Sequence, residues 1–83
     1  MKLVYFAWVR ERIGVSEEEV ALPEGVVTVA DLMQWLAGRG EAYAYAFENP
    51  KVVRAALDQH HVKASAVIGA AKEVAFFPPM TGG

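Results

Sequence analysis

The first ten residues of the chain carry apolar side chains at almost every position. Residues 1–10 are rich in Val, Tyr, Phe and Trp, so they predict a β-strand. Both faces of this strand would be apolar, with one face formed by Leu3, Tyr5, Ala7 and Val9 and the other by Val4, Phe6 and Trp8. Such a strand is typical of the centre of a sheet that is covered on both sides.

Apolar and polar residues alternate less clearly in the segment that follows. Residues 17–22 predict a second, weaker strand that ends at Pro23-Glu24-Gly25. We expect its acidic run, Glu17-Glu18-Glu19, to be solvated.

Residues 28–37 show the period of an amphipathic helix. Thr28 can cap its first turn, and Asp31 stands at the position of a shortened capping box. The spacing i, i+3, i+4, i+7 then predicts one apolar stripe facing the sheet, formed by Val29, Leu32, Met33 and Leu36. We expect Gly38 and Gly40 to end this helix in the left-handed conformation.

The second half of the chain predicts short strands. Residues 42–47 fit either a strand or a short helix, because aromatic residues alternate there with alanine. Residues 52–57, 61–63 and 73–77 predict strands, and residues 58–60 predict a hairpin turn between the first two. This order of elements predicts an α+β domain over residues 1–79, in which a mixed sheet curls around one main helix. Residues 80–83 would form a flexible C-terminal tail.

Composition excludes several classes of protein. The 83 residues suffice for one small domain, and without cysteine neither a disulfide nor a thiolate metal site can reinforce it. The net charge of −2 with no basic stripe argues against nucleic-acid binding. The longest apolar run, residues 3–9, is too short for a membrane helix, and we expect a cytoplasmic protein. The hydrophobic share of 54% indicates an apolar patch covered by another subunit, unless the many alanines account for it.

The chain offers little for catalysis of its own. Neither Ser16 nor Ser65 stands in a nucleophile-elbow motif. His60 and His61 are adjacent, so on a strand they point to opposite faces, and Asp58 with His60 would supply only two ligands. We therefore expect no metal site.

The C-terminal residues combine several features that suit insertion into another protein. The strand 73–77 runs into Pro78-Pro79, whose rings fix φ and whose nitrogens cannot donate, so the chain would leave the sheet stiff and extended. After Met80 and Thr81 come Gly82 and Gly83, which fit a narrow channel because they have no Cβ atom. A terminal carboxylate is ionised and unreactive at neutral pH, so it would need activation, for example by adenylation with ATP. The alternative is a frayed terminus that happens to contain glycine.

These residues carry a resemblance to a known family. The segment EVAFFPPMTGG, residues 73–83, resembles the C-terminal pattern of the MoaD/ThiS family of sulfur carriers, in particular the small subunits of molybdopterin synthases. VYFA at residues 4–7, with Val9-Arg10-Glu11 and Gly14, is similar to the first strand and following turn of that family, and TVADL at residues 28–32 to the start of its helix. The resemblance implies a β-grasp, ubiquitin-like fold, with a mixed sheet of about five strands packed on one main helix.

The resemblance also implies a mechanism and partners. An adenylating enzyme similar to ubiquitin-activating enzymes would use ATP to join AMP to the Gly83 carboxylate. A sulfur donor of the cysteine desulfurase or rhodanese type would then leave a thiocarboxylate on Gly83, preceded by Gly82. The tail would enter the large subunit of molybdopterin synthase, which holds the catalytic side chains, and deliver sulfur to cyclic pyranopterin monophosphate. In that family two small and two large subunits form a heterotetramer, and the small subunit holds no permanent cofactor.

The resemblance implies contacts with the large subunit through the tail and the adjacent sheet face. The residues at these positions are Phe6, His61, Phe77, Pro78, Pro79, Met80 and Thr81. His61 stands where the family usually has a larger aliphatic residue, and Ala70-Ala71-Lys72 replaces an acidic, glycine-containing turn. Three alternatives remain open: a sulfur carrier of the thiamine type, a protein modifier conjugated through Gly83, and an interaction module with an inert tail.

Overall fold

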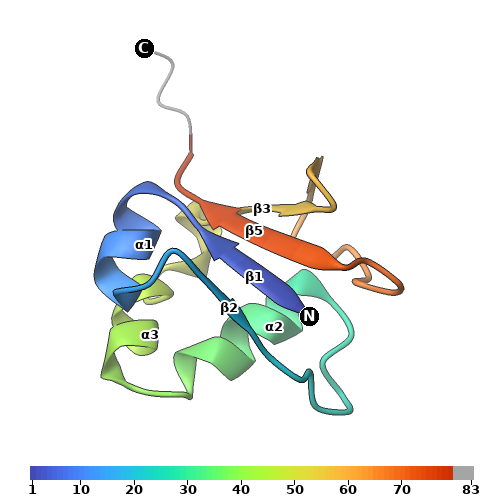
Figure 1. Ribbon diagram of the computed structural model, residues 1–83, viewed down its shortest axis with the longest axis horizontal. Helices are drawn as coiled ribbons and strands as arrows, with labels where there is room; N and C mark the ends of the chain where they lie inside the picture. The colour runs from blue at the N-terminus through green and yellow to red at the C-terminus, as the bar shows by residue number, and fades with distance from the viewer. Residues whose placement is uncertain (80–83) are drawn as a thin grey trace.

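The computed structural model describes residues 1–79, which form one mixed sheet with helices (Figure 1). The strands are β1 (Lys2–Tyr5), β2 (Glu17–Glu19), β3 (Arg54–Leu57), β4 (His60–Val62) and β5 (Glu73–Phe77). The helices are α1 (Ala7–Ile13), α2 (Val29–Ala37), α3 (Glu41–Ala46) and the 3₁₀ turn η1 (Pro50–Val52). The strand order is β2-β1-β5-β3-β4, in which only β1 and β5 pair in parallel. The predicted α+β class and five-stranded mixed sheet are therefore confirmed.

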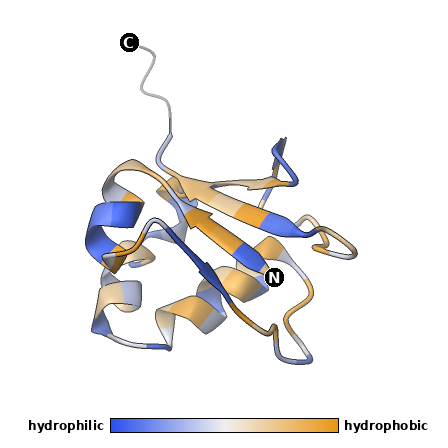
Figure 2. Cartoon of the chain, in the orientation of Figure 1, coloured by the Kyte–Doolittle hydropathy of each residue, from blue (hydrophilic) through white to orange (hydrophobic). Residues whose placement is uncertain are grey.

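The core fills the space between the sheet and α2. The sheet contributes alternate residues of its two central strands, and α2 contributes the predicted stripe, which is confirmed. The ring of Phe76 stacks on Tyr5 with centroids 6.3 Å apart and meets the edge of Phe47 at 5.1 Å. Figure 2 shows hydrophobic β1 and β5 flanked by hydrophilic β2. The largest side chains with almost no exposure are Leu3, Tyr5, Val9, Val29, Leu32, Leu36, Val74 and Phe76.

The predicted first strand is wrong beyond Tyr5. After the extended residue Phe6 the chain turns at Ala7, where φ is 51°, and residues Ala7–Ile13 form α1. Val9 is fully buried, and α1 packs against α3. Apolar residues at nearly every position fit a helix as well as a strand, so the alternation could not decide between them. The helix ends at Gly14, whose φ of 99° is the left-handed conformation that favours glycine.

The N-terminus of α2 has the predicted capping box. The Thr28 hydroxyl accepts a hydrogen bond from the Asp31 backbone N–H at 3.1 Å, and the Asp31 carboxylate accepts one from the Thr28 N–H at 3.0 Å. Hydrogen bonds from the backbone of Thr28 and Val27 hold the pKa of Asp31 below its ordinary value. This end of α2 is thus determined by residues within one turn.

The predicted left-handed stop of α2 is wrong. Gly38 has a φ of −84°, in the right-handed region, and Gly40 has a φ of 162°, which is extended backbone. The helix instead tightens at its end, where the N–H of Gly38 donates to Trp35 O and the N–H of Arg39 donates to Leu36 O. The segment after Gly40, which fitted either structure, is the helix α3.

The predicted hairpin turn is confirmed at Asp58 and Gln59, but His60, which was predicted to belong to it, is the first residue of β4, so that strand lies one residue earlier than predicted. Asp58 and Gln59 have φ values of 47° and 71°, and the antiparallel strands on either side are β3 and β4. The carboxylate of Asp58 accepts hydrogen bonds from the backbone N–H groups of Lys72 and Glu73, at 2.9 and 3.1 Å, and so ties the turn to the start of β5. The predicted strand 73–77 is confirmed, whereas β3 begins two residues late because η1 occupies Pro50–Val52.

The acidic run of β2 is divided between two environments. Its outer residues are exposed, but the half-buried carboxylate of Glu18 accepts hydrogen bonds from the hydroxyls of Tyr5 (2.8 Å) and Tyr43 (2.7 Å) and from Arg39 Nη1 (3.2 Å). Partial burial opposes ionisation, but these contacts outweigh it and hold the pKa of Glu18 below its ordinary value. Burial raises the pKa of Tyr5, and the carboxylate raises it further, so the hydroxyl remains a donor. The expectation of a solvated run is therefore wrong for Glu18, which connects β2 to the helical layer.

Candidate functional site

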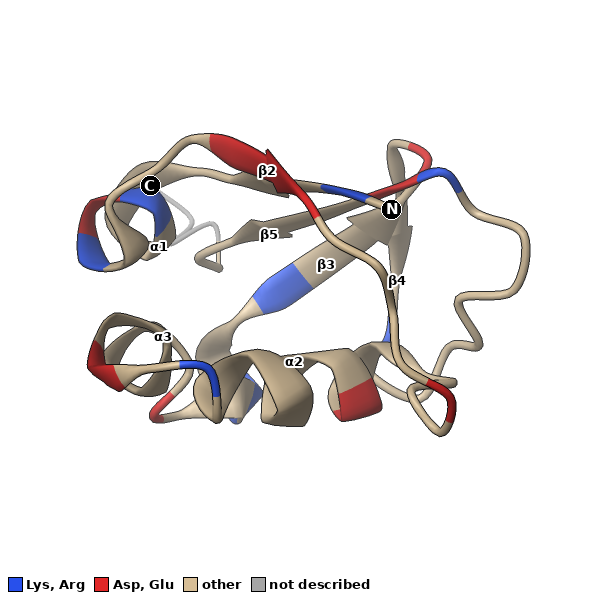
Figure 3. Ribbon diagram, turned by 60° about the horizontal axis from the view of Figure 1, so that its bottom comes forward, with Lys and Arg blue, Asp and Glu red and all other residues tan. Residues whose placement is uncertain are grey.

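The sheet has a second face, opposite α2, which we call the open face. Helices α2 and α3 lie on the other side of the strands (Figure 3). Strand register aligns one row of open-face residues from edge to edge, in the order Glu17, Val4, Ala75, Ala56 and His61. A shallow groove runs over this face, and the side chains of Phe6 and Phe77 also line it. The open face is thus assembled from all five strands of the described chain, residues 1–79.

Aromatic side chains dominate one end of the groove. Phe6 is 47% exposed, and its N–H donates a 3.0 Å hydrogen bond to Phe76 O, which fixes it beside the end of β5. The rings of His61 and Phe77 lie 5.0 Å apart between centroids, tilted by 46°. The small residues Ala56 and Ala75 form the floor, so the aromatic rings stand above it. This arrangement offers pockets between rings to an apolar partner surface.

Charged side chains occupy the other end of the groove. Lys2 Nζ lies 3.4 Å from the Glu17 carboxylate and 4.0 Å from that of Glu73. All three side chains are accessible to solvent, so these ion pairs contribute little to stability. The open face therefore changes from charged to aromatic along β1 and β5, and the aromatic end is where β5 finishes.

The structure brings together the predicted partner residues that it describes. Phe6, Phe77 and His61 line one groove, although Phe6 is more than fifty residues from the other two along the chain. Pro78 and Pro79 follow Phe77 directly and are half-buried. The predicted contacts Met80 and Thr81 and the predicted reactive residues Gly82 and Gly83 lie outside the described residues.

Sequence reasoning missed the floor of the groove. Ala56 and Ala75 belong to it, and Val4 had been assigned only to the second face of a strand. The alternation of side chains along a strand could have identified these residues. In β5, Val74 and Phe76 face the core, so Ala75 and Phe77 must face the opposite side of the sheet. Alanine drew no attention because it has no side-chain chemistry of its own.

The two adjacent histidines do not form a ligand set. His61 lies on the open face, and His60 Nδ1 is 3.1 Å from the Asp58 carbonyl oxygen. Within residues 1–79 no group of three or more His, Cys, Asp or Glu side chains is placed to hold a metal ion. Among the same residues, no helix is both long enough and apolar enough to cross a membrane. The open face thus offers an apolar contact surface with the imidazole of His61, bordered at one end by charged side chains.

The sequence of the chain is similar to those of known proteins over its whole length. The sequence pattern of the ThiS family matches residues 3–83. The chain is 40% identical over 83 residues to a molybdopterin synthase sulfur carrier subunit from Escherichia coli K12, and 32% identical to the one from Haemophilus influenzae. Each alignment covers 100% of this chain and 99% of the relative.

Solved structures agree with the fold. The crystal structure of SAMP1 from Haloferax volcanii superposes with a TM-score of 0.72 at 25% identity, covering 100% of this chain and 98% of that one. The fold is therefore the ubiquitin-like β-grasp that the sequence resemblance implied.

Proposed function

This chain belongs to the ThiS family, and from that premise we propose that it is the sulfur-carrier small subunit of a molybdopterin synthase. The observation that carries the proposal is full-length similarity to two proteins of that name. The geometry supports it, because an apolar open face adjoins the start of the tail, as a subunit with a docking surface requires. The proposal places the chain in the cytoplasm.

Under this proposal the reactive group is the Gly83 carboxylate. Ionised carboxylates are poor electrophiles, so the adenylating partner first joins AMP to Gly83 and releases pyrophosphate from ATP. The terminal sulfur of a persulfide on a cysteine desulfurase or rhodanese-type donor then attacks the acyl-adenylate carbonyl and displaces AMP, which gives an acyl disulfide. A second thiol, from the donor or from a thiol reductant, attacks the donor's sulfur, so that a disulfide forms there and a C-terminal thiocarboxylate is released. The thiocarboxylate sulfur attacks a side-chain carbon of cyclic pyranopterin monophosphate, held by the large subunit. Water then cleaves the bond between this sulfur and the Gly83 carbonyl carbon, so that the sulfur stays on the pterin and the Gly83 carboxylate is regenerated. Gly82 and Gly83 suit these steps, since backbone without Cβ atoms passes through a narrow channel.

In this proposal, residues 1–79 provide the surface that docks on the large subunit and determine where the chain leaves the sheet. Phe6, Phe77 and His61 would contact the large subunit, as exposed aromatic residues commonly dominate the binding free energy of an interface. Pro78 and Pro79 cannot donate to a ladder, so they end β5 and release the chain toward the partner. From Pro78 to Gly83 the covalent geometry allows a reach of at most roughly 20 Å. In the proposal Met80 and Thr81 line the partner's channel.

Intact-mass spectrometry tests the proposal. The full chain is incubated with ATP, an adenylating partner and a sulfur donor, and a mass gain equal to exchange of one oxygen for sulfur is expected. A chain lacking Gly82-Gly83 should show no gain, and a chain with Ala70→Gly, changed at an exposed turn, should react normally. Absence of the sulfurated species with every partner combination contradicts the proposal.

A second assay assigns the pathway. The sulfurated chain, mixed with a cognate large subunit and cyclic pyranopterin monophosphate, should yield the dithiolene product. Sulfuration without product formation would instead favour a thiamine-type carrier. Larger adducts on lysines of other proteins would favour a protein modifier.

A further inference from the structure

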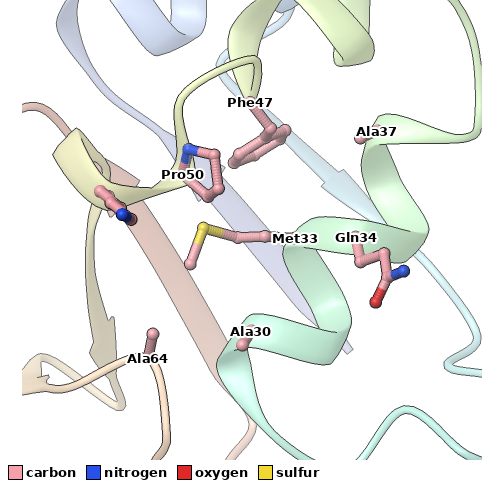
Figure 4. A pocket seen from close by; sticks show the side chains of 8 residues that line it. Ala30, Met33, Gln34, Ala37, Phe47, Pro50 and Ala64 are labelled. Carbon is pink, nitrogen blue, oxygen red and sulfur yellow. The ribbon is translucent and has the colours of Figure 1, made fainter.

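A second cleft lies on the helix side of the sheet, away from the open face. Its walls are α2 on one side and η1 with residues 63–64 on the other (Figure 4). Met33 extends from α2 across the cleft toward Pro50, with Phe47 beside it. The cavity has a volume of about 480 Å³, within the usual range of ligand sites. We call it the α2 cleft.

The α2 cleft is elongated. A neighbouring hollow shares Met33, Pro50, Lys51 and Ala64 with it and continues toward the start of β3 and the end of β4. The helix side of the first hollow consists of small or flexible residues, because Ala30 and Ala37 flank Met33. Methionine adapts its shape to different apolar occupants. A linear occupant therefore fits this cleft better than a compact small molecule.

The walls of the cleft are held in place by one backbone and one side-chain hydrogen bond. The N–H of Ala30 donates to Ala64 O at 2.8 Å, which joins the far wall to the first turn of α2. Arg54 Nη1 donates to Lys51 O at 3.0 Å, which joins η1 to β3. An occupant would thus meet a preformed surface and incur little ordering cost.

The charge of the cleft has one sign. Among residues 1–79, its ionisable lining residues are Lys51, Arg54 and Lys63, and none of the carboxylates of this part of the chain lines it. Lys2, Arg12 and Arg39 are the basic side chains with a carboxylate within 4.0 Å among residues 1–79. In a chain of net charge −2, three of the remaining five basic residues therefore gather around one apolar cleft.

We propose that the α2 cleft is a second docking surface, which binds a short acidic segment of a partner protein. The apolar floor takes one or two aliphatic side chains of that segment, and Lys51, Arg54 and Lys63 pair with the carboxylates beside them. Phe6 and Phe77 line the open face, whereas Met33 and Phe47 line the α2 cleft on the helix side, so both surfaces can be occupied at once. Arg54, the register partner of Phe77, stands at the margin between them. A partner held there would leave the open face free.

A titration followed by NMR tests this proposal on the full chain. The probe is the blocked hexapeptide Asp-Glu-Leu-Leu-Glu-Asp, added to ¹⁵N-labelled protein. Shifts are expected at the amides of Ala30, Met33, Lys51 and Ala64, with a dissociation constant on the order of 1 mM or tighter. The same peptide with Lys in place of each acidic residue should not bind. Affinity should also fall as salt is raised, because the charged rim is exposed.

Matched charge reversals locate the site. Lys51→Glu and Lys63→Glu should each raise the dissociation constant about 3–10-fold, since each removes one attraction and adds one repulsion. Lys72→Glu makes the same change of charge at another exposed position and should alter it less than about 2-fold. Filling the cleft with Ala64→Phe should weaken binding, whereas Ala70→Phe, at another exposed turn, should not.

Four outcomes would overturn the proposal. They are shifts confined to the open face, equal binding of the lysine peptide, no shifts at several millimolar peptide, and binding to anionic phospholipid vesicles in place of the peptide. The last, if abolished by Lys51→Glu, would assign the cleft to a membrane surface. None of these measurements involves sulfur transfer, so they test the second docking surface independently of the proposed function.

Discussion

The two faces of the sheet place neighbouring aromatic residues in opposite environments. Tyr5 is 1% exposed, whereas Phe6, the next residue, is 47% exposed. Phe76 is fully buried, and Phe77 stands on the open face beside His61. Whether one of these aromatic residues is part of the core or of an exposed surface therefore depends on the face of the sheet that it occupies, and not on its residue type.

The difference separates stability from docking. On the buried face, Phe76 packs against Tyr5 and Phe47, and its removal from water stabilises the folded chain. On the open face, Phe6 keeps much of its apolar surface in water, where only a partner can cover it. Variants of the two faces should consequently fail in different assays.

The largest effect is expected on the buried face. Phe76→Ala should lower the free energy of unfolding by about 3–5 kcal/mol, because it leaves a cavity between Tyr5 and Phe47. Phe77→Ala, one residue away, should cost about 1 kcal/mol or less. Urea denaturation monitored by tryptophan fluorescence measures both. Equal losses would show that the open face also supports the fold.

A smaller loss is expected where β2 joins the helical layer. Glu18→Gln weakens the hydrogen bonds from Tyr5, Tyr43 and Arg39 and should cost about 1–3 kcal/mol at neutral pH. Because the folded pKa of Glu18 lies below its unfolded value, its contribution is fully present above about pH 4.5 and is lost as pH falls through the folded pKa.

The pH dependence provides the control for this variant. The difference in unfolding free energy between the original chain and Glu18→Gln should shrink below about pH 4. Glu19→Gln removes only an exposed ion pair with the N-terminal ammonium, at 3.2 Å, so it should differ from the original chain by less than about 1 kcal/mol at every pH. A difference that is constant with pH would show that ionisation of Glu18 does not contribute.

The open face should affect binding more than folding. Phe6→Ala should weaken affinity for the large synthase subunit by at least about 10-fold while changing stability by less than about 1 kcal/mol. Val67→Ala, which shortens an even more exposed apolar side chain, is the matched control and should bind normally. Calorimetry of the two variants distinguishes a docking face from incidental exposure.

The smallest effect is expected at the cap of α2, the helix that covers the buried face. Thr28→Ala should cost about 1 kcal/mol, because the hydroxyl that accepts from Asp31 N–H is lost. Thr28→Ser keeps the acceptor and should restore most of the stability. Thermal unfolding checks the pair, and partner affinity should not change in either variant.

Prediction from sequence was accurate for several features whose determining contacts are local, although the left-handed stop predicted at Gly38 and Gly40 was wrong. The capping box of α2 lies within three residues, and the turn at Asp58-Gln59 needs only backbone preferences. Strand β5 was found with its boundaries because Pro78 must end it. It failed in residues 7–13, where a helix and a strand fit the apolar pattern equally well and packing on α3 decided between them.

The sequence by itself determined the helix α2 with its capping box, the family, and the succession of strand, prolines and glycines in residues 73–83. These depend on backbone preferences and on neighbours along the chain. Tertiary structure alone decided that Glu18 would meet Tyr5, Tyr43 and Arg39, and that Ala56 and Ala75 would lie side by side on the open face. The physical reason is that strand register and helix packing join residues far apart in the chain, and no local pattern records which of them will meet.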